Sequence, residues 1–225
     1  MAVAVAVDEP GLCPEGPHWD NRTGTLLYVD IDGQKVHRWN PVTRQKDTVA
    51  MDCMVGAVVP REAGGVVVAA GTKFTFLDFE TRQLTDVATV DQHKPTNRFN
   101  DGKCDAAGRF WAANRRKVVS FEESRDGVPD GMCIDTDGKL WVAMFGTGQV
   151  LQVDPETGTH LRTVKVPADQ TTSCCFGGPN LDILYVTTAS VGLSAEEVQQ
   201  KPLSGCVFQV TGLGARGTPG LCYNG

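Results

Sequence analysis

The chain has 225 residues, which exceeds the commonest domain size but suits a single all-β domain. Hydrophobic residues make up 41% and charged residues 21%, a balance that is typical of a folded globular protein and excludes a disordered one. The formal net charge of −6 disfavours a nucleic-acid partner but permits a cation site, and 25 glycines indicate many tight turns.

The N-terminal segment and the cysteines bear on where the protein works. Residues 1–7 are apolar but lack a basic region, so we expect no secretory signal. No apolar run approaches about 18 residues, so we expect no transmembrane helix and no membrane partner. The eight cysteines form no Cys-x-x-Cys pair and are few for a disulfide scaffold, which indicates reduced, mostly buried thiols in a reducing compartment. Cys174 and Cys175 are adjacent and would point to opposite faces of a strand.

Two sequence patterns alternate along the chain. The first pattern is an acidic or small residue, a short strand, a turn and a second apolar or aromatic strand; it recurs at residues 15–30, 55–69, 100–112, 129–143 and 172–187. The second pattern is a strand that runs into a turn rich in Pro, Thr or Gly, at residues 36–45, 74–83 and 150–159. Residues 194–200 are the best candidate for a helix. Short strands that repeat every 40–50 residues or so are typical of β-propeller blades.

The spacing of the first pattern is uneven. The intervals between successive copies are 40, 46, 29 and 42 residues, measured between Gly16, Gly56, Gly102, Gly131 and Ser173. Four strands with their turns need about 40 residues, so the interval of 29 is too short for a blade. Within it, residues 117–121 offer one plausible strand. One blade is therefore incomplete, or the chain has lost a segment there.

Three carboxylates occupy the same position in the first repeated pattern, just before the strands that we expect to be innermost. They are Glu15, Asp101 and Asp130. Because innermost strands line the central channel of a propeller, these side chains could converge at its mouth. Hard oxygen ligands favour Ca²⁺, Mg²⁺ or Mn²⁺, with Zn²⁺ also accepted. The alternative is that Asp-Gly and Glu-Gly are turn sequences without a ligand.

Arg98 and Asn100 form a second candidate site beside Asp101. They are two residues apart, so on an extended segment they face the same way and could bind substrate hydroxyls or a carboxylate. The alternative is that Arg98 is a surface ion-pair partner. The four histidines show no metal-ligand spacing, and no Gly-x-Ser-x-Gly sequence supports a serine hydrolase.

Several longer motifs resemble those of the gluconolactonase-like family, in order and over nearly the whole chain. They lie at residues 15–19, 97–103, 129–135, 138–143, 154–158, 171–178 and 210–214. The resemblance implies an all-β, six-bladed propeller that hydrolyses sugar lactones with a divalent metal ion. Family members are longer than this chain by more than one blade. The resemblance therefore also implies that residues 1–225 form a single propeller domain from which more than one blade's worth of sequence is missing. Whether its ring of blades closes is left open by the sequence.

The resemblance assigns roles to the candidate residues. It implies that Glu15 and Asp130 are metal ligands and that Asp130 is also the catalytic acid or base. Arg98 and Asn100 match the family's substrate-contacting residues, and Asp101 lies beside them in a supporting role. The family's middle Asn ligand has no counterpart here, because it falls in the missing segment, whose junction we place near residues 113–114.

Three functional hypotheses follow. The first is a gluconolactonase-type lactone hydrolase, a carboxylic ester hydrolase that uses Ca²⁺, Zn²⁺, Mn²⁺ or Mg²⁺ and acts on a small sugar lactone as a cytoplasmic monomer. The second is a non-catalytic calcium-binding or regulatory protein. The third is a shortened variant without activity.

Overall fold

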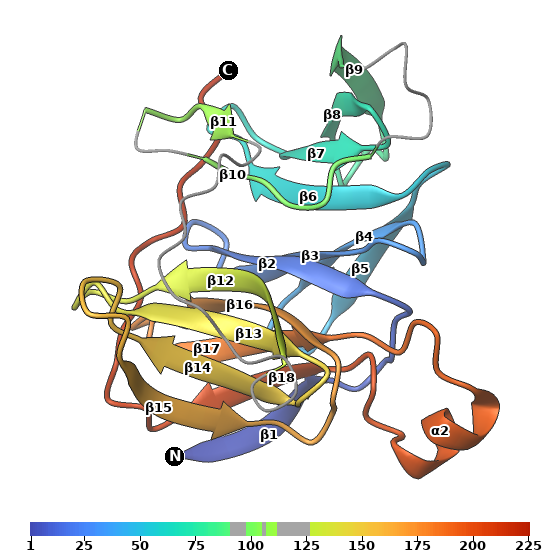
Figure 1. The fold of residues 1–225 in the computed structure, drawn as a ribbon. Coiled ribbons are helices and arrows are strands. Elements are labelled where there is room, and N and C mark those ends of the chain that lie inside the picture. Colours follow the sequence, from blue (N-terminus) through green and yellow to red (C-terminus); the bar gives the residue numbers. More distant parts are fainter. Residues whose placement is uncertain (91–97, 105–106, 112–126) are drawn as a thin grey trace.

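The computed structural model describes residues 1–90, 98–104, 107–111 and 127–225. The described part of the chain is built almost entirely from antiparallel strands (Figure 1). The first sheet consists of β2 (Pro14–Asp20), β3 (Thr25–Asp30), β4 (Lys35–Trp39) and β5 (Lys46–Ala50). The second consists of β6 (Val55–Pro60), β7 (Val66–Ala70), β8 (Lys73–Leu77) and β9 (Leu84–Thr89). The third consists of β12 (Val128–Ile134), β13 (Leu140–Phe145), β14 (Gln149–Val153) and β15 (His160–Lys165).

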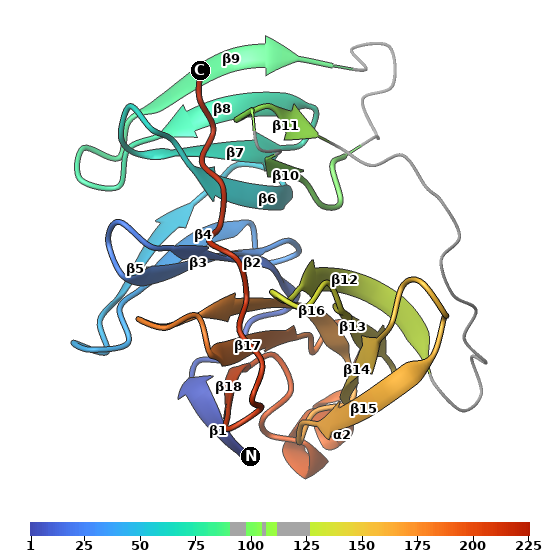
Figure 2. The ribbon, with the colours of Figure 1, turned by 90° about the vertical axis from the view of Figure 1, so that its left-hand side faces the viewer.

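The fourth sheet joins the first strand of the chain to the last one. It contains β16 (Thr171–Gly177), β17 (Ile183–Thr188) and β18 (Val207–Thr211), and the N-terminal strand β1 (Ala2–Val7) pairs with β18 at its edge (Figure 2). The helix α2 (Ala195–Gln200) lies between β17 and β18, and Ser194 caps it through a reciprocal capping box with Glu197. The helix predicted at residues 194–200 is therefore confirmed. In the described part of the chain no helix has the length and apolar character needed to span a membrane.

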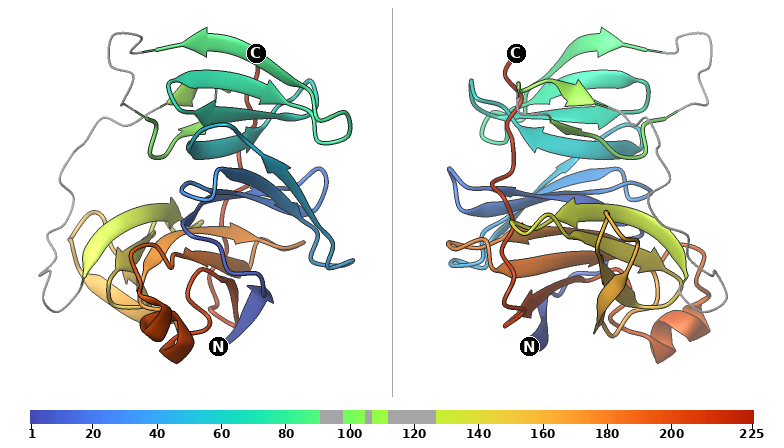
Figure 3. Two further views of the ribbon diagram at one scale, coloured as in Figure 1. Left: turned by 90° about the vertical axis from the view of Figure 1, so that its right-hand side faces the viewer. Right: turned by 60° about the vertical axis from the view of Figure 1, so that its left-hand side comes forward.

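The four sheets follow one another around an arc, like blades of a propeller (Figure 3). The second blade packs on the first, the first on the fourth, and the fourth on the third. The innermost strands β2, β6, β12 and β16 contain the residues that marked the repeat, and β10 (Lys103–Cys104) follows directly after Gly102. The propeller fold predicted from the repeats is confirmed. The described residues hold four complete blades, so the count of six implied by the resemblance is not reached in them.

The interval of 29 residues contains the smallest sheet. Here β10 pairs with β11 (Phe110–Trp111) through two residue pairs, and β10 lies against β6. The predicted strand at residues 117–121 and the predicted junction near residues 113–114 lie outside the described residues. A sheet of two strands covers less of the neighbouring blade than a sheet of four strands does. The innermost strand β12 accordingly exposes Val128, Met132 and Ile134, whereas β6 and β16 are buried along their whole length.

The hydrophobic core lies between the faces of neighbouring blades. One cluster joins the first and second blades through residues such as Val29 and Val68, and another joins the third and fourth through Trp141 and Phe208. Cys174 belongs to this second cluster, while its neighbour Cys175 belongs to a separate cluster beside the first blade. The prediction that these two side chains point to opposite faces is confirmed.

The second repeat is the third strand of a blade with its following turn. An Asn or Asp side chain at the end of the strand accepts hydrogen bonds from backbone N–H groups two or three residues on, which closes the turn; the three are Asn40, Asp78 and Asp154. Four residues later each copy has a left-handed backbone, with φ of 61° at Arg44, 61° at Arg82 and 70° at Gly158. The repeated sequence therefore encodes one turn geometry.

Candidate functional site

The innermost strands share a local irregularity that shapes the candidate site. Their pairing with the second strand of the blade shifts near its start in all four complete blades, between Glu15 and His18 in β2 and between Pro129 and Met132 in β12. A bulge of this kind bends a strand and re-aims the side chains beside it. Gly16 permits the bend in β2 through a φ of +54°. Glu15 borders the bulge of β2, and Asp130 lies within that of β12.

Strand β16 lies between β2 and β12 and fixes both of them. The Thr172 hydroxyl donates to the Pro14 carbonyl over 2.6 Å, directly before Glu15. On the other side, Gly131 packs so tightly that a Cβ there would lie 2.1 Å from the Ser173 Oγ. These two contacts hold the strand starts that carry Glu15 and Asp130 on either side of β16.

The three predicted carboxylates influence one another electrostatically. Glu15 is 4% exposed, and Asp101 and Asp130 are half-buried. Burial raises the pKa of the Glu15 carboxyl well above its usual value, and the negative charges of Asp101 and Asp130 raise it further. Burial followed by the charge of Asp101 raises the pKa of Asp130 to about 6. Burial also raises the pKa of Asp101, against the opposing effect of the Lys103 ammonium. The three side chains therefore make one region of negative charge, which the Lys103 ammonium offsets in part.

The segment with Arg98 and Asn100 is anchored by the residue between them. The Phe99 N–H donates to the Gly71 carbonyl over 3.2 Å, and the Phe99 ring lies 4.7 Å from that of Phe74 in β8. Arg98 and Asn100 are exposed, and an Arg98 guanidinium N–H donates to the Asn100 Oδ1 over 2.9 Å. The two side chains do face the same way, as the extended spacing predicted.

A close backbone contact holds this segment against the second blade. A Cβ added to Gly56 in β6 would lie 2.3 Å from the Phe99 carbonyl oxygen, so only glycine fits there. Phe99 and Gly56 position this segment; the sequence analysis used Gly56 only as a marker of the repeat and did not single out Phe99. In the sequence, the only signal for Phe99 was an aromatic residue between two polar ones. No local pattern shows that Phe99 packs against Gly56.

The donor chemistry of the carboxylate region suits a divalent cation. Carboxylate oxygens are the ligands that Ca²⁺, Mg²⁺ and Mn²⁺ prefer, and a cation would offset the repulsion that raises the pKa values of Glu15 and Asp130. Among the described residues, however, no group of three or more His, Cys, Asp or Glu side chains is placed to hold a metal ion. The roles of Glu15, Asp101 and Asp130 stay predictions.

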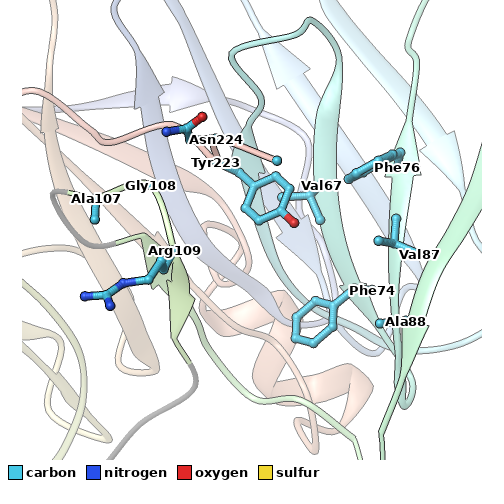
Figure 4. A pocket seen from close by; sticks show the side chains of 11 residues that line it. Val67, Phe74, Phe76, Val87, Ala88, Ala107, Gly108, Arg109, Tyr223 and Asn224 are labelled. Atoms are coloured by element: carbon cyan, nitrogen blue, oxygen red, sulfur yellow. The ribbon is translucent and has the colours of Figure 1, made fainter.

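A cavity of about 400 Å³ lies elsewhere, between the second blade and the C-terminal tail (Figure 4). Phe74, Phe76 and Val87 line one side and Tyr223 lines the other, with the rings of Phe76 and Tyr223 6.1 Å apart. Its lining contains none of the predicted site residues. This mainly apolar cavity is therefore separate from the candidate site.

Comparison with known sequences gives a consistent family. The sequence model of the SMP-30/gluconolactonase/LRE-like region matches residues 13–116 and 112–190. Regucalcin from Danio rerio is 39% identical over 294 aligned positions, which cover 100% of this chain and 99% of the relative. Regucalcin from Homo sapiens is 35% identical over 285 positions, covering 95% of each chain. The alignment with the Danio rerio protein is 69 positions longer than the 225 residues of this chain.

Solved structures share the fold. A luciferin-regenerating enzyme superposes with a TM-score of 0.91 at 25% identity and covers 99% of both chains. A calcium-binding regucalcin from Agrobacterium tumefaciens gives 0.88 at 22% identity, covering 99% of this chain and 97% of that one. A gluconolactonase from Xanthomonas campestris gives 0.70 at 17% identity, covering 92% and 88%. At these last two identities the likeness concerns the fold.

Proposed function

The chain belongs to the SMP-30/gluconolactonase/LRE-like family, and on this premise we propose that it hydrolyses sugar lactones with the aid of a divalent metal ion. One observation carries the proposal. Glu15 and Asp130 stand at equivalent bulges of two innermost strands that both pack on β16. Two carboxylates from different blades are thereby directed to the same end of the propeller axis.

In this proposal Glu15 and Asp130 would hold the ion, and the family's middle Asn ligand has no counterpart in this chain. A divalent ion bound there would polarise the lactone carbonyl and stabilise the negative charge that develops on its oxygen. Asp130 takes the proton of the attacking water as that oxygen bonds to the carbonyl carbon. The ester C–O bond then breaks, and the ring oxygen accepts a proton to give the hydroxy acid. An ionised Asp130 carboxylate is suited to act as this base.

The exposed pair Arg98 and Asn100 would bind the sugar. The guanidinium and the amide offer several donors on one side of an anchored segment, so they can hold hydroxyl oxygens of the lactone in a fixed orientation. Asp101, next to Asn100, supports the site through its charge. A small sugar lactone is thus the proposed substrate, and a monomeric state and a cytoplasmic location remain expectations from the sequence.

We also propose that the chain is a family member with an internal segment missing near residues 113–114. Two observations support this. The family model matches in two stretches that meet at residues 112–116, and the Danio rerio alignment has 69 more positions than this chain has residues. The short interval between Gly102 and Gly131 is the place where such a loss fits the repeat.

The proposal is tested by following acid release from a gluconolactone by the purified chain, with and without added Ca²⁺, Zn²⁺, Mn²⁺ or Mg²⁺. We expect metal-stimulated hydrolysis above the spontaneous rate. The Asp130→Asn variant should lose at least about 10²-fold in rate, because it removes a ligand and the base together. Glu196→Gln, on the exposed helix α2, is the matched control and should keep full activity. Absence of metal-stimulated hydrolysis, with Danio rerio regucalcin active in the same assay, would refute the proposal.

A non-catalytic cation-binding protein is the second candidate. The repulsion among Glu15, Asp101 and Asp130 supports it, since carboxylates can bind a cation without fixing a substrate. Calorimetry distinguishes it from an inactive chain: binding of Ca²⁺ or Zn²⁺ without lactone hydrolysis supports it, and no binding removes it.

A further inference from the structure

A second cavity, of about 330 Å³, lies among the innermost strands and contains thiols. Its lining includes His18 of β2, Lys103 of β10, Cys133 of β12 and Cys175 of β16, together with residues of the C-terminal tail. His18 and Cys133 lie later in the strands that carry Glu15 and Asp130 near their starts. The cavity is therefore distinct from the carboxylate region, and the proposed lactone hydrolysis makes no use of it.

Two sulfur atoms from neighbouring blades meet at this cavity. The Sγ of Cys133 lies 3.7 Å from the Sγ of Cys174 in β16. A disulfide bond needs about 2.05 Å, so a small side-chain rotation would bring the sulfurs together. The tight contact between Gly131 and Ser173, two residues and one residue away, already holds the two strands at close range.

The surroundings expose the Cys133 sulfur to the cavity and bury the Cys174 sulfur beside it. Cys133 is half-buried and lines the cavity, so a small oxidant can reach it. Cys174 is buried, and its thiol also lies 3.2 Å from the Trp141 carbonyl oxygen. The Lys103 ammonium donates to the Met132 carbonyl over 3.3 Å, next to Cys133 in the chain. Its positive charge lowers the pKa of the Cys174 thiol, but the hydrogen bond with Cys133 and burial outweigh this effect and raise that pKa well above its usual value.

We propose that Cys133 and Cys174 form an oxidation site in which a hydroperoxide converts the two thiols to a disulfide between the third and fourth blades. The Cys133 thiolate attacks the peroxide oxygen, the O–O bond breaks, and a sulfenic acid forms with release of one water or alcohol. The Cys174 sulfur then attacks the Cys133 sulfur, and the hydroxyl of the sulfenic acid leaves with the Cys174 proton as a second molecule, of water. The two sulfurs lose two electrons, the peroxide gains them, and the two thiol protons end in the products.

The disulfide would tie β12 to its one complete neighbouring blade. The two cysteines are 41 residues apart in the sequence, so the cross-link closes a long loop and restricts the unfolded chain. Because β12 exposes an apolar side, this is a part of the propeller where a cross-link adds most to the existing contacts. We expect oxidation to raise the melting temperature by roughly 5 °C or more.

The test uses the purified full chain, treated with hydrogen peroxide, blocked with iodoacetamide and mapped by mass spectrometry without reduction. We expect a loss of two of the eight thiols, a mass decrease of about 2 Da before blocking and a peptide that links Cys133 to Cys174. The link should disappear on reduction and in Cys133→Ser, and it should persist in the control Cys53→Ser, which lies in the turn before β6. The wild-type map is decisive without any variant. Oxidation of other cysteines with no linked peptide, or of Cys133 only to the sulfinic acid, overturns the proposal.

Discussion

Replacing Gly56 by alanine tests whether the Arg98 and Asn100 segment is held by its contact with the second blade. The new Cβ would lie 2.3 Å from the Phe99 carbonyl oxygen and 2.6 Å from its carbonyl carbon. Real Cβ atoms stay at least 3.0 Å from such atoms. Because both partners are backbone, the segment must move by about 0.7 Å or more, and the ring contact between Phe99 and Phe74 loosens with it.

The expected cost follows from these contacts. Overpacking of this kind costs about 1–3 kcal/mol of folding free energy, which for a chain of this size lowers the melting temperature by roughly 2–12 °C. Displacement of substrate-orienting groups by nearly 1 Å lowers catalytic efficiency by up to about 10²-fold. Since the proposed metal ligands Glu15 and Asp130 lie on other strands, cation affinity should stay within about twofold of the original value.

The assay compares kcat/KM for gluconolactone hydrolysis and calorimetric cation affinity in Gly56→Ala and a control variant. Gly138→Ala is the control, because its φ of +74° strains an alanine while no atom lies within 4 Å of the new Cβ. It should lose comparable stability and keep its activity. Equal activity losses in both variants, or full activity in Gly56→Ala, would refute the role of Phe99 as a positioning residue.

Three further predictions concern stability. Burial lowers the pKa of His37 to about 4, so below pH 6.5 the unfolded state binds more protons than the folded state. The free energy of unfolding therefore falls as the pH drops from 6.5 towards 4. Between pH 7 and pH 5, urea unfolding should show that His37→Gln loses about 2 kcal/mol less of this free energy than the original chain. The buried Asp135 carboxylate accepts from Trp141 Nε1 at 2.9 Å and Gln152 Nε2 at 3.1 Å, so Asp135→Ala should cost about 3–5 kcal/mol in the same assay, and a loss below about 1 kcal/mol would contradict this account. Deleting residues 1–7 removes β1 and exposes the edge of β18, so the shortened chain should melt several degrees lower and scatter more light; unchanged melting and scattering would show that the terminal strand adds little.

The sequence was most informative where one local rule repeats. The five copies around Gly16 and its equivalents predicted the innermost strands, because a small residue at the bulge and a turn behind the strand recur in each blade. The uneven spacing predicted the incomplete unit, because 29 residues cannot supply four strands, and β10 with β11 is the part of it that the structure describes. The positions of Glu15 and Asp130 at the starts of innermost strands followed from the same repeat, while their role as metal ligands stays a prediction.

Contacts between blades were not predictable in this way. The fit of Phe99 on Gly56 joins residues 43 positions apart, and the pair of Cys133 and Cys174 joins residues 41 positions apart. Neither contact follows the sequence repeat, because each depends on how neighbouring elements of the propeller pack after they have formed. The burial that raises the pKa of Glu15 likewise arises only when the first and fourth blades pack together.

The most direct test of the central claim is calorimetric titration of Mn²⁺ into the metal-free chain at neutral pH, with Glu15→Gln and Glu196→Gln measured beside it. If Glu15 and Asp130 hold the cation, the original chain and Glu196→Gln bind one ion per chain, and Glu15→Gln binds it at least about tenfold more weakly. The same affinity in Glu15→Gln as in the original chain would contradict a metal site at the starts of β2 and β12.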